Sequence, residues 1–329
     1  MPITSSPRIG RRALIGLATL ASTAPLAGAA NAIPPPDPAE TVPLWPGRPP
    51  GARETLPREE IVDRIATSGF QDRYVTGIGR PLLTVVRPAR PNGAALIVAP
   101  GGGYIRVVID KEGFEVARRM AAEGITVFIL RYRLPGEGWD RGADAPLHDA
   151  QRAVRLVRAG AKGFGVDPRR LAFMGFSAGG HVATSIATRF AEPAYAPIDA
   201  ADALSARPDL SVPVYPVVTM DPTFAHSGSR ATFLGPTPTP ELEARYSPER
   251  HVTPQVPPTF LVHAWDDTSV PVQNSLRYLE ALGVSKVPAE AHLFAEGGHG
   301  FGIRGAQGKP AAAWPDLFVA WARRQGFFG

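Results

Sequence analysis

Ser177 is the residue whose surroundings most directly indicate chemistry. It lies in Gly175-Phe176-Ser177-Ala178-Gly179, a G-x-S-x-G motif between the apolar run 171–176 and a helical pattern at 181–190. The tight turn from strand to helix strains the backbone of such a serine and projects its hydroxyl above the sheet. Gly175 and Gly179 leave room for the neighbouring strand and helix, because neither has a Cβ atom. The motif predicts a nucleophilic serine; the alternative is a glycine turn with no catalytic role.

A serine hydroxyl is a weak nucleophile at neutral pH, so it requires a base and an acid that orients the base. With this motif the chain order is serine, acid, histidine. His299 is the last of seven histidines and lies in the glycine-rich loop 297–300, after the apolar run 289–294. His292 lies inside that run, and His181 follows the serine by one helical turn, where we expect it to support the site. We therefore predict His299 as the general base.

The strand 289–294 leads to His299, and the strand before it is expected at 259–263. The orienting acid should follow this earlier strand. The apolar run 259–263 is followed closely by two aspartates, Asp266 and Asp267. An aspartate in a loop most often holds its own backbone in a turn, and this applies equally to both. The residue types alone leave both aspartates as candidates.

Ester hydrolysis also needs hydrogen-bond donors where the oxyanion forms. The run 94–99 ends in Pro100-Gly101-Gly102-Gly103-Tyr104, and consecutive glycines let backbone amides approach a substrate oxygen closely. The amide of Ala178 would complete this oxyanion hole. A phosphate-binding loop is the alternative, but neither G-x-G-x-x-G nor the lysine-containing loop is matched, because Arg106 stands in place of the last glycine.

The elements that must position these residues alternate along the chain. Short apolar runs after Pro81 indicate strands, and several are apolar throughout, as expected for strands covered on both faces. Longer amphipathic segments between and after them indicate helices, for example at 150–162, 271–282 and 315–325. The expected strands are 82–86, 94–99, 125–132, 171–176, 212–218, 259–263 and 289–294.

This alternation predicts an α/β fold, a mostly parallel twisted sheet with helices on both faces. We find no internal repeat, so one catalytic domain should cover residues 81–327. In such sheets ligands bind at the carboxyl ends of the strands, which is where the candidate residues lie.

The composition is that of a globular protein with a large core, because 44% of the 329 residues are hydrophobic and 20% are charged. The formal net charge of +5 includes Arg8, Arg11 and Arg12, which share residues 1–32 with no acidic residue. The rest is nearly balanced and has no basic stripe, which argues against a nucleic-acid partner. The chain has no cysteine, which excludes disulfides, thiolate nucleophiles and cysteine-ligated metals.

Residues 1–32 have the three parts of an export signal. Arg11-Arg12 precede a weakly apolar stretch that ends at the small-residue cleavage site Ala30-Asn31-Ala32. Paired arginines in this place are typical of the twin-arginine signal. A membrane anchor is the alternative, but polar residues break the stretch before the roughly 20 residues that span a bilayer. We expect the twin-arginine export machinery as a partner, no stable membrane insertion after cleavage, and a periplasmic or secreted location.

Residues 33–80 form a proline-rich N-terminal extension. Pro34-Pro35-Pro36 and Pro38 cannot supply the hydrogen bonds of a helix or a central strand. We therefore expect this extension to lie in an extended conformation over the surface.

Together the motifs resemble the α/β-hydrolase superfamily, and in particular its exported carbohydrate-esterase branch, the acetyl-xylan and feruloyl esterases. The resemblance rests on GFSAGGH at 175–181, PGGGY at 100–104 and GGHGFG at 297–302, and it extends in order over nearly the whole mature chain. In this branch the acid lies in a pattern H-G-x-x-D-x-x-V-P, which corresponds to 263–271 and implies Asp267. The same likeness implies Gly102 and Gly103, with Ala178, as the oxyanion donors.

The chain departs from this pattern at two positions. Pro100 replaces the histidine of the related H-G-G-G motif of lipases, which separates the chain from that branch. Trp265 occupies a place beside the acid that is often small or polar, where it would narrow the acyl pocket and favour acetyl over feruloyl. We expect Tyr104 and Trp265 to be substrate-binding residues.

The resemblance implies a serine esterase that hydrolyses acyl esters, foremost acetyl esters, on plant polysaccharide or oligosaccharide through an acyl-enzyme, with no metal or organic cofactor. A general small-ester esterase or lipase is one alternative. A peptidase of the prolyl-oligopeptidase type is another, but the chain leaves no room for its propeller domain. A catalytically inactive sugar-binding protein would not need the three candidate residues, and a metal-dependent hydrolase lacks support because H-E-x-x-H is absent.

Overall fold

The computed structural model describes residues 36–328, and the chain from Asp37 onward forms one compact unit. The export signal expected at residues 1–32, including its cleavage site, lies outside the described residues. The same holds for the first residues of the proline-rich extension.

The core of this unit is an eight-stranded sheet in the order β1-β4-β7-β5-β8-β9-β10-β11. The strands from β7 to β11 are all parallel, and only β1 and β4 at one edge run antiparallel to their neighbours. The expected mostly parallel sheet is therefore confirmed. The bounds are β1 Thr41–Pro43, β4 Leu82–Val86, β5 Ala95–Ala99, β7 Thr126–Arg131, β8 Leu171–Phe176, β9 Leu210–Val214, β10 Thr259–Ala264 and β11 Ala289–Phe294.

The central strands β5, β8, β9 and β10 are buried along their whole length, as their continuous apolar runs require. Strand β9 ends at Val214, four residues earlier than expected, because Tyr215 has a φ of 35° and Pro216 cannot supply a strand hydrogen bond. The apolar run 212–218 conceals this turn, so the expected strand was wrong at this end.

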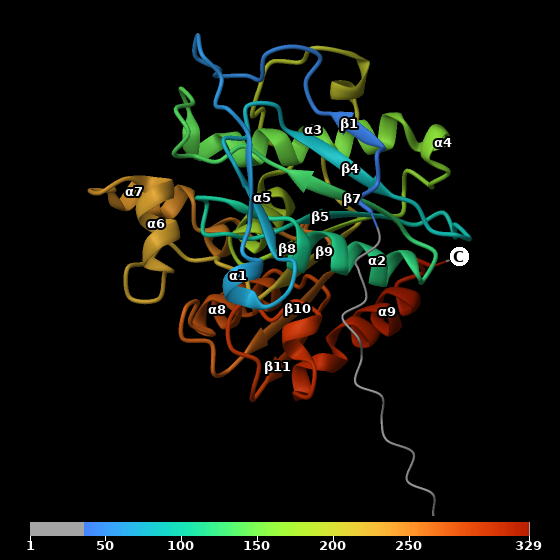
Figure 1. Ribbon diagram of the computed structural model, residues 1–329. Coiled ribbons are helices and arrows are strands. Elements are labelled where there is room, and N and C mark those ends of the chain that lie inside the picture. The colour runs from blue at the N-terminus through green and yellow to red at the C-terminus, as the bar shows by residue number, and fades with distance from the viewer. Residues whose placement is uncertain (1–35, 329) are drawn as a thin grey trace, which may run out of the picture. The chain divides into compact units, whose positions relative to one another are not determined.

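Helices cover both faces of the sheet. Figure 1 shows α3 on one side of strands β4, β7 and β5, with α2 and α9 on the other side. Helix α5 packs against α3 and against β8 and β9. The longer helices are α2 Glu115–Ala121, α3 Ala145–Ala159, α5 Ala178–Arg189, α8 Gln273–Val284 and α9 Trp314–Arg324. Helices α3, α5, α8 and α9 correspond to amphipathic patterns of the sequence.

The segment 37–80 is part of the compact unit, although most of its residues are exposed or half-buried, so the unit begins before the expected boundary at residue 81. Strand β1 joins the edge of the main sheet, where Pro43 is tolerated. Strands β2, Glu60–Asp63, and β3, Arg73–Thr76, form a second sheet with β6, Val107–Val108. Leu44 is completely buried. The segment joins the compact unit because apolar residues such as Leu44 stand between its prolines and pack into the core.

Several smaller helical elements were not expected from the sequence. A π-helical turn, Asp110–Phe114, leads into α2. Helices α6, Ser227–Leu234, and α7, Pro240–Arg245, form an insertion between β9 and β10, which Figure 1 shows in yellow-orange tones.

Candidate active site

The structure places Ser177 in the turn between β8 and α5. Its backbone has φ 53° and ψ −117°, a conformation that is rare for a residue with a side chain. A Cβ atom at Gly175 would collide with the carbonyl of Gly179, and one at Gly179 would collide with the carbonyl of Ala99 at the end of β5. Both glycines are therefore required by close packing of helix against strand. The strained turn directs the hydroxyl away from the sheet, as the motif predicts.

Ser177 and His299 lie together although 122 residues separate them. Ser177 Oγ is 2.8 Å from His299 Nε2, and His299 Nδ1 is 2.7 Å from Asp267 Oδ2. Because the carboxylate can only accept, Nδ1 carries the proton and Nε2 accepts from the hydroxyl. The structure thus distinguishes the two aspartates. Asp266 instead accepts from the amides of Gly297 and Gly298, at 2.9 and 2.7 Å, and so holds the loop that carries His299.

Asp267 is buried and has several donors besides His299. Its Oδ1 accepts from the amides of Ser269 and Val270, and its Oδ2 lies 3.2 Å from Nε2 of His263. Burial alone would raise the pKa of this carboxyl, but hydrogen bonds from His263 and His299 outweigh burial and hold the pKa well below its usual range. The carboxylate therefore stays ionised next to His299.

His263 is a functional neighbour that reasoning from the sequence missed. Its Nδ1 is 2.6 Å from the hydroxyl of Ser275, and its Nε2 also lies 3.0 Å from the carbonyl of Val270. Because that carbonyl accepts, Nε2 carries the proton that Asp267 shares. The spacing of four residues between His263 at the end of β10 and Asp267 was the available signal.

The glycines expected to form the oxyanion hole border the same cavity as Ser177 and His299, with a volume of about 390 Å³. Gly102 has φ 136° and Gly103 has φ 65°, and a Cβ atom at Gly102 would collide with the carbonyl of Arg106. Within residues 36–328, nothing accepts a hydrogen bond from the amides of Gly102 or Gly103. Ala178 is the first residue of α5, where helix amides have no intrahelical partner.

A buried link, which the sequence did not indicate, joins the glycine loop to the loop of His299. Glu112, in the π-helical turn, accepts from the amide of Gly101 at 2.8 Å and from the hydroxyl of Tyr215 at 2.9 Å. The Tyr215 hydroxyl in turn accepts from the amide of Gly302 at 3.0 Å. The Tyr215 ring packs edge-on against His299, with 5.3 Å between ring centroids. Burial and the Glu112 carboxylate hold the pKa of Tyr215 well above its usual value, so the phenol stays neutral.

Neither expected substrate-binding residue lines this cavity. Tyr104 is buried, and its hydroxyl donates to Nδ1 of His181 at 2.7 Å, while Nε2 of His181 donates to the carbonyl of Tyr246. Burial lowers the pKa of His181 to about 4, so it is a neutral support behind the glycine loop. The Trp265 side chain is 55% exposed. The expectation that Trp265 narrows the acyl pocket was therefore wrong.

The cavity has a cationic lining. Arg64, Arg106 and Lys111 border it, and Glu112 is the single acidic side chain among its described lining residues. Arg64 is paired with Asp72 at 2.6 Å, and the guanidinium of Arg106 lies over the Tyr74 ring, 5.0 Å from its centroid. With Arg64 paired to Asp72, the described lining still carries the two cations Arg106 and Lys111 against the one carboxylate of Glu112.

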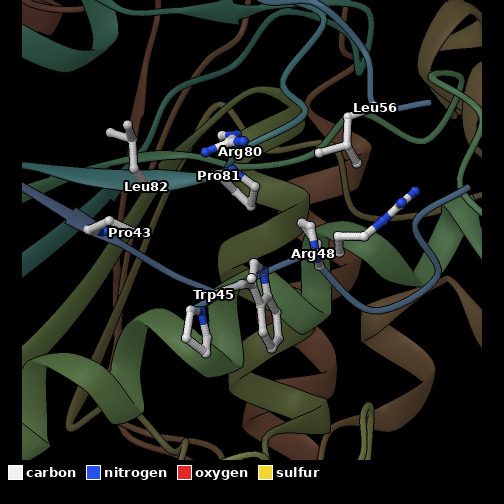
Figure 2. Close-up of a pocket in the computed structure, with 10 residues that line it drawn as sticks. Pro43, Trp45, Arg48, Leu56, Arg80, Pro81 and Leu82 are labelled. Atoms are coloured by element: carbon white, nitrogen blue, oxygen red, sulfur yellow. The ribbon is translucent and has the colours of Figure 1, made fainter. Parts of the chain in front are cut away.

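A second, larger cavity of about 580 Å³ lies at the β1–β4 edge of the sheet. Figure 2 shows Pro43 and Trp45 from the segment of β1, together with Pro81 and Leu82 at the start of β4. It contains none of the three hydrogen-bonded residues, and its walls are mostly apolar. Size alone therefore does not identify the catalytic cavity in this molecule.

Two structural absences apply to residues 36–328. No helix in this part of the chain is long and apolar enough to cross a membrane. In the same residues, no group of three or more histidines or acidic residues is arranged to hold a metal ion.

Comparison with known proteins identifies the family. The model of the BD-FAE family matches residues 86–282. An acetylxylan esterase of Xylanibacter ruminicola is 32% identical over 68% of this chain and 44% of its own length. An endo-1,4-beta-xylanase B of Butyrivibrio fibrisolvens is 35% identical over 63% of this chain and 32% of its own length. The chain thus spans less than half the length of these curated relatives.

Among solved structures, the acetyl ester-xyloside bifunctional hydrolase from Caldicellulosiruptor lactoaceticus is similar over almost its whole length. It superposes with a TM-score of 0.72 and 34% identity, covering 89% of this chain and 98% of its own. The expected α/β-hydrolase fold is confirmed by this neighbour and by the sheet order. The chain belongs to the BD-FAE family.

Proposed function

We propose that the protein is a serine esterase that removes acetyl groups from xylan-type polysaccharide or its fragments. The observation that carries this proposal is the continuous chain of hydrogen bonds from Ser177 through His299 to Asp267 beside the amides of Gly102 and Gly103. Ester hydrolysis by a serine requires a nucleophile, a general base, an acid that orients the base, and oxyanion donors.

The relatives support the choice of acyl group and substrate. They include an acetylxylan esterase and an acetyl ester-xyloside bifunctional hydrolase, and both names refer to acetyl esters on xylose-based sugars. A cavity of about 390 Å³ accommodates an acetyl ester of a sugar unit.

In the proposed mechanism, Ser177 Oγ attacks the ester carbonyl carbon while Nε2 of His299 accepts its proton. The amides of Gly102, Gly103 and Ala178 donate to the resulting oxyanion. The intermediate collapses by breaking the bond to the sugar oxygen, which receives the proton from His299, and acetyl-Ser177 remains. Water then attacks the acetyl carbonyl, with His299 again as base, and a second collapse releases acetate and restores the serine. Asp267 keeps the proton of the imidazole on Nδ1 throughout.

The experiment that tests this proposal compares the wild type with Ser177→Ala on acetylated xylan, feruloylated arabinoxylan and p-nitrophenyl acetate. We expect acetate release by the wild type to exceed ferulate release, and Ser177→Ala to lose roughly a millionfold in kcat with an unchanged melting temperature. Equal turnover by the variant would refute the mechanism. Binding of acetylated xylo-oligosaccharide without any turnover by the wild type would instead favour the inactive sugar-binding alternative.

We also propose export through the twin-arginine pathway, which rests on the residues Arg11 and Arg12 and on the small-residue site at Ala32. The test is the full chain with both arginines replaced by lysine, expressed in a bacterium that has this pathway. We expect the wild type in the periplasm or medium and the double variant in the cytoplasm. Equal export of both chains would contradict the proposal.

A further inference from the structure

His226 is a pocket-lining histidine that the mechanism above does not use. It precedes α6 and caps that helix, because its Nδ1 accepts from the amide of Ser229 at 3.0 Å. The hydroxyl of Ser229 is also 2.8 Å from the same nitrogen. The imidazole thus has a structural role through one of its two nitrogens.

The cap determines where the ring proton lies. A backbone amide can only donate, so Nδ1 of His226 is an acceptor, and the proton of the neutral ring is on Nε2. Burial lowers the pKa of His226, and the nearby charge of His299 lowers it further, so the neutral ring is the form present at neutral pH. His226 therefore cannot replace His299 as a base, because the lone pair of Nδ1 is engaged in the helix cap and Nε2 already carries the ring proton.

The His226 ring borders the catalytic cavity. His226 lines it together with Ser177, His299 and Gly103. Its Cε1 atom, which is bonded to Nε2, is 3.8 Å from the point that a Cβ atom on Gly103 would occupy. Among residues 36–328, no hydrogen-bond partner of Nε2 is present. A half-buried ring with an unused N–H group thus borders the cavity next to Gly103, one of the residues proposed to bind the oxyanion.

We infer that His226 is an additional oxyanion donor, a side chain acting beside the backbone amides. Its Nε2–H would hydrogen-bond to the ester oxygen that becomes negative in the transition state. This inference rests on the proposed function. The bond would strengthen as charge develops on that oxygen, so it should act mainly on kcat rather than on KM. It would act on any acetyl ester, because the oxygen belongs to the acetyl group and not to the sugar.

Two substitutions separate this role from helix capping. Asparagine places its amide oxygen near the position of Nδ1 and is a good cap, but nothing in it reaches the position of Nε2. Glutamine is one methylene longer and places an N–H group near Nε2, but it loses the cap. We expect His226→Asn to keep the melting temperature and to lower kcat on p-nitrophenyl acetate at least about tenfold, with little change in KM. We expect His226→Gln to be less stable and to retain more of kcat.

His226→Ala gives an independent comparison, because it loses both the cap and the donor. Its kcat should be about tenfold below that of His226→Gln at similar stability, which isolates the N–H group even if the asparagine variant folds poorly. His251→Asn is the matched control. It makes the same chemical change between β9 and β10, where Nε2 of His251 binds the carbonyl of Ala244 and the ring does not line the cavity.

Several outcomes would overturn the inference. His226→Asn with the kcat of the wild type, or equal kcat in His226→Gln and His226→Ala, would show that Nε2–H gives nothing to the transition state. A loss confined to acetylated xylo-oligosaccharide, with p-nitrophenyl acetate unaffected, would place the bond on the sugar and refute the oxyanion assignment. These results leave the proposed function intact if Ser177→Ala is inactive, whereas a wild type that hydrolyses no acetyl ester refutes the proposed function itself.

Discussion

Asp267 has four hydrogen-bond donors, and only one of them is His299. The others are His263 and the amides of Ser269 and Val270. Because the pKa of Asp267 lies far below its usual range, the carboxylate does not titrate where an esterase works. The acid limb of a pH–rate profile should therefore not report loss of this carboxylate.

The first prediction concerns this carboxylate. Asp267→Asn keeps the shape of the side chain but offers an amide N–H to the imidazole, which favours the wrong tautomer of His299. We expect a loss of roughly 10⁴ in kcat on p-nitrophenyl acetate with the fold retained. Asp266→Asn is the control, because Asp266 contacts loop amides and not the ring, and it should lose far less. Equal losses in the two variants would contradict the assignment of the acid.

At this scale, the sequence does not determine the direction in which a side chain points. The G-x-S-x-G motif and the order of residues along the chain pointed to Ser177 and His299, which the structure places within hydrogen-bond distance. The two aspartates could not be separated by residue type, because the difference is which way two adjacent side chains turn at the end of β10. Tyr104 and Trp265 were misjudged for the same reason: position in a motif does not determine the direction of a side chain.

At the scale of elements, the turn after β9 connects two loops of the candidate site. The positive φ of Tyr215 ends the strand and directs its ring toward His299 and its hydroxyl toward Glu112. The glycine loop after β5 and the loop after β11 are thereby fixed to one buried carboxylate. A change at Tyr215 should therefore loosen both loops.

The second prediction tests this link with Tyr215→Phe. The variant keeps the ring against His299 but removes the hydroxyl, which leaves an oxygen of Glu112 and the amide of Gly302 without a protein partner. We expect the free energy of unfolding, measured in urea, to fall by about 1–3 kcal/mol. Tyr278→Phe is the control, because the hydroxyl of Tyr278 is buried with no hydrogen-bond partner among residues 36–328, so its removal should cost little. A smaller effect at Tyr215 than at Tyr278 would refute the link.

The sheet was largely predictable because buried parallel strands appear as continuous apolar runs. The insertion with α6 and α7 was not, since short helices with few buried residues have weak patterns. Strand β1 was also missed, since three residues that include Pro43 give no periodic signal. These elements are determined by what they contact in the folded molecule and not by their own composition.

At the scale of the whole molecule, the segment after β1 is fastened to the core by a buried polar cluster. Trp45 Nε1 donates to Asp149 at 2.8 Å, and Asp149 is paired with Arg133 where neither side chain is exposed to solvent. The guanidinium of Arg133 also lies over the rings of Trp45 and Trp139. The N-terminal part of the compact unit is therefore held by interactions that reach its centre.

The third prediction concerns this attachment. Trp45→Phe retains an aromatic ring but removes the donor to Asp149, a buried charge, so we expect a loss of about 1–3 kcal/mol in the free energy of unfolding. Trp139→Phe is matched to it, because Trp139 packs on the same Arg133 but its buried indole nitrogen has no hydrogen-bond partner in the described part of the chain. Thermal and urea unfolding of both variants would check this, and equal stability of the two would contradict it.

The cationic side chains that line the catalytic cavity have a consequence for the reaction rate when product accumulates. The proposed reaction converts an uncharged ester into an anion inside a cavity that Arg106 and Lys111 border. We expect added acetate to inhibit competitively in about 10 mM salt, where the screening length is about 30 Å, and far less in about 1 M salt, where it is about 3 Å. Initial rates at the two salt concentrations would measure this. An enzyme with such a cavity would slow down as its own product accumulates. In a saline medium this product inhibition would be weaker.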